Sequence, residues 1–473
     1  MLFFLALYYL IFAILSWQKP ERGVMIIIFA LPSYLIRFNL FGLPSTLLEG
    51  MILIAFFIWF IKNYREVFGN IKKRIKGKKI IGWVRYPFDL EIVLLLIVSI
   101  IAAGIAYFSR ESLGIWKAYF FEPILFFILL FNTIGKDALN QKGSKWLEKI
   151  IWPLALSCLA VSVLAVYQKF TGQFIDNPLW AAESTRRVVS FFGYPNAVGL
   201  FLGPISLVLF GWMAKEKENL RAEGMTGKLK LLVISLTVFL SWAAIIFAKS
   251  TGAALGVAAG LIVFALLGGK RIRLVVAAGA LIMVIGIAAC APARNYAIDK
   301  ITLKTVSGEI RKQQWEETWN MLKDGRLLSG AGLDNYQTAI KSYHQEGIWF
   351  NRFNESDKDF LRKIMQSEEY RKLVWQPTEI YMYPHNIFLN FWSELGLAGL
   401  LLFVWIIGKY FYLGLRRLKD GDYTISGLIG AMAVIVVHGL VDVPYFKNDL
   451  SIIFWLFVFM LSAINLKANI KKV

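Results

Sequence analysis

The sequence is poor in charged residues, in cysteine and in histidine. Asp, Glu, Lys and Arg account for 18% of its 473 residues, and it has two cysteines and three histidines. Two cysteines are too few for a disulfide scaffold, and an apolar share of 57% excludes a disordered chain. A water-soluble domain of this size needs a more polar surface than these residues provide. The composition therefore predicts an integral membrane protein.

The sequence also lacks the short motifs that bind nucleotides and metals. It contains no phosphate-binding loop, no HExxH motif and no Cys/His spacing typical of a metal site. The triplet Asp357-Lys358-Asp359 has the DxD form used by some metal-dependent glycosyltransferases, but it lies within a run of surface charges. We therefore expect neither a cofactor nor a bound metal ion.

Long apolar runs are abundant. A helix that crosses about 30 Å of hydrocarbon needs roughly 17–25 mostly apolar residues. We expect an all-α polytopic membrane protein with about 12–13 transmembrane helices and one large helical extracytoplasmic loop. The first run lacks a charged start and a cleavage site, so it is expected to be a span and not a signal peptide. The candidate runs lie near residues 1–17, 23–41, 45–62, 91–108, 113–134, 148–168, 195–213, 230–248, 251–269, 272–290, 387–408, 424–442 and 449–467.

Lysine and arginine follow the odd-numbered runs, which predicts that these loops are cytoplasmic. The densest cluster lies in residues 62–85, and the tail ends with Lys471 and Lys472. This pattern puts the N-terminus outside and the C-terminus in the cytoplasm. About thirty of the 52 basic residues fall in cytoplasmic segments, so membrane topology and contact with anionic lipid explain the charge of +20. No nucleic acid partner is expected.

Two longer loops then fall on the extracytoplasmic side, at residues 169–194 and 291–384. In the second loop, residues 308–324 have the apolar spacing of an amphipathic helix. Residues 328–335 are typical of a turn, and residues 355–373 form a second helical stretch. We expect N-terminal transmembrane helices over residues 1–180 and a membrane domain over residues 181–473 that includes the large loop at 291–384.

Polar residues at membrane depth are costly and are therefore candidates for function. His385 lies where the large loop re-enters the membrane. Either it caps the start of a helix, or its neutral imidazole takes a proton from a sugar hydroxyl. Arg187 lies at the end of the shorter loop. It binds either headgroup phosphate or a specific diphosphate, because the guanidinium group matches phosphate oxygens.

Further candidates lie in the same half of the chain. Arg311 opens the amphipathic stretch and is either solvated or bound to phosphate. His438 and Asp442 are four residues apart on one face of a span, where a structural hydrogen-bonded pair competes with a catalytic role. The remaining intramembrane charges, expected to be paired within the bundle, are Glu394, Lys117 and Glu122.

Several of these residues lie in blocks that resemble the O-antigen ligase and O-antigen polymerase superfamily. The most specific block is His385-Asn386 followed by Gly396 and Gly399. Further blocks, in the same order as in the family, are Arg187 to Asn196, Arg311 through Leu333, and His438 to Pro444.

The chain departs from the family pattern at two places. Lys249-Ser250-Thr251-Gly252 lies where members often carry Ser-Arg-Gly, which removes one basic residue, and Arg326 lies where proline is common. The resemblance covers roughly residues 180–460.

The resemblance implies a GT-C-like enzyme of the cytoplasmic membrane with an extracytoplasmic active site. Such enzymes take a glycan from undecaprenyl diphosphate and pass it to lipid A–core, a growing polysaccharide or a protein, without a nucleotide or a metal. The hypothesis that follows is that Arg187 and Arg311 hold the diphosphate while His385 acts as general base, with inversion at the anomeric carbon. The supporting residues would be Asn386, Asn196, Gly396, Gly399, Glu394, His438 and Asp442.

The large loop is expected to cover a cavity that opens sideways to the lipid. Its candidate sugar-facing or interfacial aromatic residues are Trp315, Trp319, Trp349, Tyr381 and Tyr383.

A transporter or flippase that moves the same lipid-linked glycan is the competing interpretation. The many spans and buried charges suit a transporter, but the sequence has no visible inverted repeat, and its large outer loop bears the candidate residues. A third interpretation, a non-catalytic scaffold for envelope assembly, leaves the His385 block without a role.

Overall fold

The computed structural model describes residues 2–40, 43–75, 87–140, 145–418 and 422–470. Nearly all of its regular structure is helical. The bundle helices before the large loop are α1 (Leu2–Gln18), α2 (Pro20–Phe29), α3 (Leu47–Ile75), α4 (Asp89–Ile105), α5 (Arg110–Trp116), α6 (Glu122–Asn132), α7 (Ile134–Asn140), α8 (Lys145–Thr171), α9 (Pro178–Ala181), α10 (Pro195–Ala222), α11 (Met225–Phe247), α12 (Thr251–Leu267) and α13 (Lys270–Ala289).

The remaining helices form the large loop and the C-terminal part of the bundle. They are α14 (Ala291–Ile301), α15 (Val306–Met321), α16 (Tyr336–Ile340), α17 (Asp357–Gln366), α18 (Glu368–Val374), α19 (Ile387–Arg417), α20 (Tyr423–His438) and α21 (Asn448–Ile470). Three short turns, η1 (Leu31–Leu35), η2 (Lys117–Phe121) and η3 (Leu322–Arg326), join or extend helices. The strands pair as two small hairpins, β1 (Arg37–Leu40) with β2 (Leu43–Thr46) and β3 (Gly347–Trp349) with β4 (Trp375–Pro377).

Within the described residues, eight helices are long and apolar enough to cross a membrane. These candidate spans are Leu47–Gly69, Arg110–Leu139, Lys145–Thr171, Pro195–Ala222, Met225–Phe247, Ile272–Ala289, Ile387–Arg417 and Asn448–Leu466. Three shorter apolar helices accompany them, Phe3–Gln18, Thr251–Leu267 and Tyr423–His438. The expected fold class is confirmed: the chain is an all-α polytopic integral membrane protein.

The expected span at residues 23–41 is not a single helix. Helix α2 ends at Phe29, a 3₁₀ turn follows over Leu31–Leu35, and the chain then enters the β1–β2 hairpin, in which Arg37 pairs with Thr46. Pro32 explains the break, because its ring cannot continue an α-helix and disfavours helical backbone at the preceding residue.

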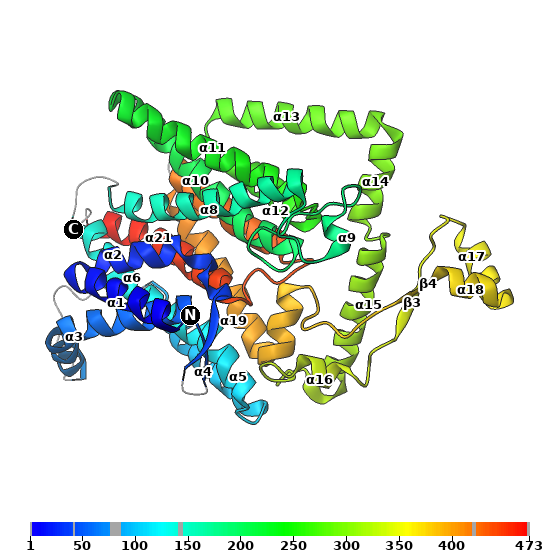
Figure 1. The fold of residues 1–473 in the computed structure, drawn as a ribbon, viewed down its shortest axis with the longest axis horizontal. Helices are drawn as coiled ribbons and strands as arrows, with labels where there is room; N and C mark the ends of the chain where they lie inside the picture. The colour runs from blue at the N-terminus through cyan, green and yellow to red at the C-terminus, as the bar shows by residue number, and fades with distance from the viewer. Residues whose placement is uncertain (1, 41–42, 76–86, 141–144, 419–421, 471–473) are drawn as a thin grey trace.

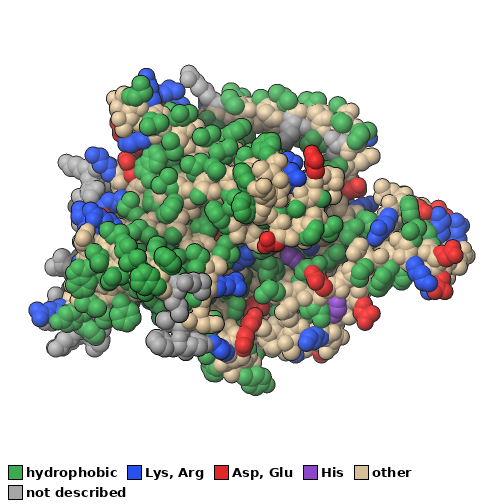
Figure 2. All heavy atoms as spheres, in the orientation of Figure 1, with side chains coloured by type: hydrophobic (Ala, Val, Ile, Leu, Met, Phe, Trp, Pro, Cys, Tyr) green, Lys and Arg blue, Asp and Glu red, His purple; other side chains and the backbone are tan. Residues whose placement is uncertain are grey.

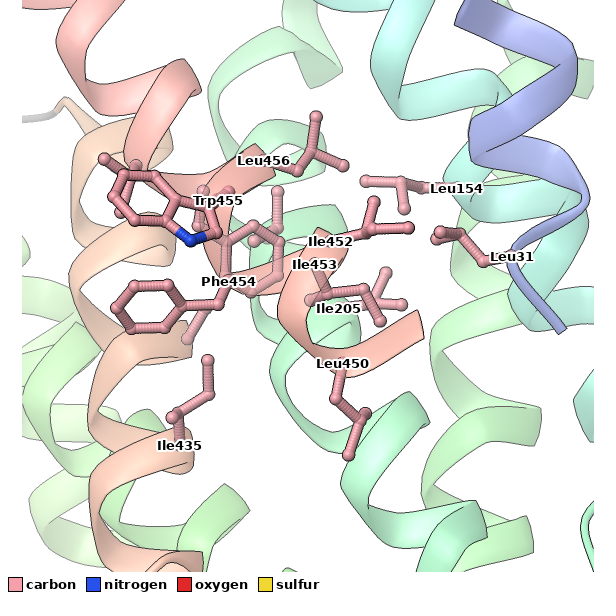
Figure 3. Packing of buried hydrophobic residues seen from close by; sticks show 14 of the residues in the cluster. Leu31, Leu154, Ile205, Ile435, Leu450, Ile452, Ile453, Phe454, Trp455 and Leu456 are labelled. Carbon is pink, nitrogen blue, oxygen red and sulfur yellow. The ribbon is translucent and has the colours of Figure 1, made fainter. Parts of the chain in front are cut away.

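Helix α21 lies at the centre of the bundle. Its side chains from Ile452 to Leu461 are essentially inaccessible to solvent. Figure 3 shows Ile452, Ile453 and Phe454 packing between residues of neighbouring elements, among them Ile205 of α10 and Ile435 of α20. A helix that is apolar all round is expected to be enclosed by other helices, which is its position here.

Close contacts between glycines hold α20 against α10 and α12. A Cβ atom added to Gly211 of α10 would lie 2.7 Å from the Cα atom of Gly427 in α20. One added to Gly430 would lie 2.9 Å from the carbonyl oxygen of Gly260 in α12. Small residues at such crossings let helix backbones approach closely, which is how helices gain packing energy in a membrane.

The expected pairing of Lys117 with Glu122 is found, whereas Glu394 accepts from a backbone N–H group and has no ion pair among the described residues. The Nζ atom of Lys117, at the π-helical turn η2, lies 3.1 Å from Glu49 and 3.9 Å from the expected partner Glu122. Lys409 of α19 lies 2.6 Å from Glu91 of α4. These pairs join the N-terminal helices to each other and to α19, because neither member can be left alone in hydrocarbon.

Residues 291–384, which we call the cap segment, lie across one end of the bundle. In Figure 1 the long helices α8, α11 and α13 run horizontally, whereas α14 and α15 run vertically at the right-hand end. Helix α15 and the turn at 328–335 confirm two predictions. The expected helical stretch at 355–373 is two helices, because Ser367 ends α17 and caps α18. The β3–β4 hairpin was not predicted.

The opposite end of the bundle carries Lys and Arg side chains (Figure 2) and the C-terminus (Figure 1). The basic clusters expected there are described only in part, because residues 76–86 and 471–473 lie outside the described residues. The clearly placed basic residues include Arg416 and Arg417 at the end of α19.

Candidate functional site

A small polar pocket lies where the bundle meets the cap segment. Its volume is about 170 Å³, and its walls come from the first turn of α12, the end of α14, the start of α15 and the loop after α20. Four of the lining residues are basic and one is acidic. The charged and polar side chains that line it are Arg187, Lys249, Lys300, Arg311, Asn196, Thr251, Thr305, Ser307, His438 and Asp442.

Carbonyl groups hold the two arginines in place. The Nε atom of Arg187 donates to the oxygen of Ala248 at 3.0 Å, and that of Arg311 donates to the oxygen of Val441 at 3.0 Å. Within the described residues, neither guanidinium pairs with a carboxylate. Burial and the charge of Arg311 lower the pKa of Arg187. The two like charges therefore share a pocket whose one carboxylate, Asp442, forms no ion pair with either of them, which favours an anionic ligand.

Two lysines complete the basic lining, and the sequence did not single out either as a pocket residue. Lys249 links α11 to α12 with a left-handed φ of 50°, and Lys300 lies in the last turn of α14. The block at Lys249 was expected to have lost a basic residue. Lys249, the first residue of that block, itself lines the pocket. For Lys300 no signal existed, because its position depends on how α14 packs.

Asp442 connects the pocket to the neighbouring histidine. One carboxylate oxygen accepts from the Nδ2 atom of Asn196 at 3.1 Å, and the other accepts from the N–H of Val443 at 2.9 Å. The second oxygen also lies 3.8 Å from Nδ1 of His385. Burial acts to raise the pKa of Asp442, but the imidazoles of His385 and His438 together with the Val443 N–H hold it below its usual range. The carboxylate is therefore ionised at neutral pH.

His385 lies beside the pocket and is not one of its lining residues. It contacts Asp442, which does line the pocket. Its side chain is 18% exposed, and its backbone adopts a left-handed φ of 47°. The rings of Tyr381 and Tyr383 flank the imidazole edge-on, with centroid distances of 5.2 and 5.1 Å. Trp315 of α15 donates its indole N–H to the carbonyl oxygen of Pro384 at 2.9 Å. The Nδ1 atom of the imidazole has no hydrogen-bond partner among the described residues, so the contacts around the ring are the two aromatic side chains and the carboxylate of Asp442.

Asn386, and not His385, caps the helix that follows. Its side-chain oxygen accepts from the N–H groups of Phe388 and Leu389, which is the usual role of asparagine at a helix N-cap. Its Nδ2 atom donates to the oxygen of Leu440 at 3.1 Å, in the loop after α20. His385 and Asn386 therefore have different roles. Asn386 holds the loop after α20 against the start of α19, and this places His385 next to Asp442.

His438 lies in the wall of the pocket but does not pair with Asp442. Helix α20 ends at His438, so Asp442 is in the following loop and not on the same helix face, and no hydrogen bond joins the two side chains. The expected structural pair is therefore not formed. The Nδ1 atom of His438 is buried without a partner among the described residues. A Cβ atom on Gly252 would lie 2.7 Å from the imidazole, so that glycine leaves room for the ring.

Gly396, Gly399 and Glu394 lie away from the pocket, where the cap segment joins α19. Gly396 kinks α19 with φ 73° and ψ −174°. The turn at 328–335 inserts into this kink, since the N–H of Leu397 donates to the oxygen of Leu328 and Glu394 accepts from the N–H of Asp334. These residues shape the fold that carries His385.

The expected aromatic residues divide into two groups. Tyr381, Tyr383 and Trp315 surround His385, as described above. Trp319 packs on Trp392 of α19 with a centroid distance of 5.5 Å, and Trp349 packs on Trp375 in the β3–β4 hairpin at 4.6 Å. The acidic triplet begins α17, where Asp359 pairs with Arg362. Within the described ranges, no group of three His, Cys, Asp or Glu residues has the arrangement of a metal site.

Comparison with known protein families finds a match to part of the chain. Residues 236–404 match the family described as O-antigen ligase (Wzy_C). The match begins in α11, includes the whole cap segment and ends in α19, and it contains Lys249, Lys300, Arg311 and His385. Among curated proteins, no match was found. Over this part of the chain, the match supports the resemblance to the O-antigen ligase and O-antigen polymerase superfamily.

Proposed function

We propose that the protein transfers a glycan from undecaprenyl diphosphate to an acceptor hydroxyl at the outer face of the cytoplasmic membrane. The observation that carries this proposal is a pocket with four basic side chains and a single carboxylate, Asp442, whose Oδ1 atom lies 3.8 Å from Nδ1 of His385. In this orientation the basic end of the bundle faces the cytoplasm and the cap segment lies outside, so the C-terminus is cytoplasmic.

The basic pocket is suited to the diphosphate of the donor. Its volume is below the roughly 300–1,000 Å³ of pockets that enclose whole small molecules, so it fits a charged group and not a glycan chain. Arg187 and Arg311 offer forked N–H groups, and Lys249 and Lys300 add point charges. Negative charge grows on the diphosphate oxygen as the anomeric C–O bond breaks, and prearranged cations stabilise that charge without a metal ion.

His385 is suited to activate the acceptor. The acceptor oxygen forms the new bond to the anomeric carbon, its proton passes to the imidazole, and the electron pair of the breaking C–O bond goes to the diphosphate. The charge of Asp442, 3.8 Å from Nδ1 of His385, stabilises the protonated form of the imidazole. Because the basic pocket and His385 lie on two sides of Asp442, the leaving group and the nucleophile can meet the sugar from opposite faces, which gives inversion.

An apolar groove offers a place for the polyprenyl chain. It lies between α13 on one side and α10 and α12 on the other, with a volume of about 530 Å³ and a lining that includes Phe210, Leu261, Phe264, Val275 and Val276. Helix α12 connects this groove to the pocket, because its first turn lines the pocket and its last turns line the groove. The site residues from Arg187 to Asp442 all lie within residues 181–473, which we take as the catalytic unit.

The test is transfer by the purified protein. Protein in detergent is incubated with lipid-linked glycan and acceptor extracted from its own host, and the release of undecaprenyl diphosphate is measured. We expect release with the wild type and none with His385→Ala. His344→Ala is the matched control, because His344 lies in the cap segment next to Glu317 and outside the pocket. Movement of lipid between leaflets without release would instead identify a flippase.

A further inference from the structure

A second and larger groove lies on the outer side of α15. It has a volume of about 890 Å³ and runs between α15, the β3–β4 hairpin and α17. In Figure 1 the segment from β3 to β4, with α17 and α18, extends away from the bundle beyond α15. We call residues 345–377 the arm. We propose that the groove between α15 and the arm binds the glycan of the lipid-linked donor, an inference that rests on the proposed function.

The lining combines two tryptophans and hydroxyl-binding groups of α15 with apolar side chains of α17, Phe360, Leu361, Ile364 and Met365. The indole rings of Trp349 and Trp375 pack at 4.6 Å with an angle of 58° between them, and Trp349 remains 43% exposed. Glu316 is exposed on α15 and has no ion pair among the described residues. Sugars present C–H faces that pack on aromatic rings and hydroxyl groups that donate to carboxylates, so this mixture suits them.

Gln313 adds an observation that points to a ligand. It is 8% exposed, and its Nε2 atom donates to Glu317 at 2.6 Å and to the oxygen of Gln345 at 2.7 Å. Its Oε1 atom is buried and has no partner among the described residues, although the residue lines the groove. A buried acceptor without a donor is costly, and a sugar hydroxyl would satisfy it. An apolar partner would instead leave both Gln313 and Glu316 dehydrated without partners.

The shared helix α15 connects this groove to the donor. Arg311 and Gly308 face the diphosphate pocket, whereas Glu309, Gln313 and Glu316 follow helical spacing on the other side of α15 and face the groove. A helix with its side chains is about 10–12 Å wide. The reacting sugar therefore stays on the pocket side of α15, and the groove meets only sugars further along the chain.

This geometry predicts a dependence on glycan length that binding measurements can detect. The three probes are undecaprenyl diphosphate, undecaprenyl diphosphate with a single N-acetylglucosamine, and the lipid-linked glycan extracted from the host. We expect Trp349→Ala to raise Kd for the extracted glycan about five- to tenfold and Glu316→Gln about threefold, without effect on the two short probes. The matched control is Phe353→Ala, an aromatic residue of the arm that is 53% exposed and lies outside the groove.

The two variants and a pocket variant separate the possible failures. Glu316→Gln changes one exposed side chain of a helix and leaves the arm folded, so it keeps the test valid if Trp349→Ala disturbs the hairpin. Unchanged Kd for the extracted glycan in both groove variants overturns the inference, and so does an effect confined to the KM of the acceptor. Arg311→Gln should raise Kd for all three probes. If it raises none of them, the diphosphate pocket and the proposed function are wrong, whatever the groove variants do.

Discussion

Replacing Gly396 with alanine should separate the turn at 328–335 from α19. The backbone at Gly396 has φ 73° and ψ −174°, a conformation that residues with a Cβ atom rarely adopt. The added Cβ would also lie 2.1 Å from the carbonyl oxygen of Leu328, which belongs to the backbone and cannot rotate away. Either the kink in α19 or the turn at 328–335 must move, and either movement disturbs the hydrogen bonds between them.

The expected cost follows from these contacts. The unfavourable backbone conformation costs about 1–3 kcal/mol, and the overlap with Leu328 adds about 1–3 kcal/mol. Moving the turn also strains the hydrogen bonds from Leu397 to Leu328 and from Ala331 to Ser393, which are 3.2 and 2.6 Å long. The total destabilisation of about 2–6 kcal/mol should lower the Tm by about 2–6 °C for a chain of 473 residues. Because α19 begins just after His385, the transfer activity of this variant should also fall.

The assay compares melting temperature and protease cleavage within residues 328–335 for wild type, Gly396→Ala and Gly408→Ala. Gly408 is the matched control, because it lies in the same helix and an added Cβ meets nothing within 4 Å. Its replacement should leave the Tm equal or slightly higher, since alanine favours helix. Gly330→Ala disturbs the same contact from the side of the turn. The double variant Gly330→Ala/Gly396→Ala should therefore lower the free energy of unfolding by less than the sum of the two single variants. Equal melting and cleavage for Gly396→Ala and Gly408→Ala would refute the reasoning.

Three further results are expected. Arg311→Gln should lower kcat/KM for the lipid-linked donor about 10- to 100-fold. Lys300→Gln should lower it less, because a forked charged hydrogen bond contributes more than a point charge. Wild-type activity in both variants would argue against the pocket. The pKa of Asp442 is lower in the folded protein than in the unfolded chain, where an aspartate titrates near 3.9. Its ionised form therefore stabilises the fold above about pH 4, and this stabilisation is lost as the pH falls below that value. The Tm of Asp442→Asn should therefore fall less than that of wild type between about pH 6 and pH 3, and an equal fall would contradict this. A membrane-impermeant maleimide should label exposed Cys290 from outside intact cells, whereas buried Cys158 stays unlabelled; labelling only after permeabilisation would reverse the proposed orientation.

Apolar runs made most of the fold predictable, because a helix in hydrocarbon must be long and apolar to satisfy its own backbone. The prediction failed at residues 23–41, where hydrophobicity alone could not show that Pro32 starts a turn and a hairpin. In the cap segment, helical spacing predicted α15, whereas the β3–β4 hairpin has only three residues in each strand. Such short strands carry almost no period that could distinguish them from a loop.

The candidate site was predictable where chemistry follows short motifs. His385, Arg187 and Arg311 were recognisable as polar residues at places that exclude charge. The contact between His385 and Asp442 was not, because it depends on the loop after α20 and on Asn386, which holds that loop through Leu440. Spacing alone suggested a pairing of Asp442 with His438, but the helix ends between them.

The distribution of ion pairs supports the pocket without reference to any motif. Within the described residues, Lys117, Lys149 and Lys409 in the bundle each have a carboxylate partner, as unpaired charges at such depth are costly. The two pocket arginines share their half-buried position but have only carbonyl partners. If these bases served only to hold the fold together, an acidic partner or an apolar substitute would stabilise it more. Their unpaired state is therefore explained best by an anion that occupies the pocket during function and supplies the missing charge.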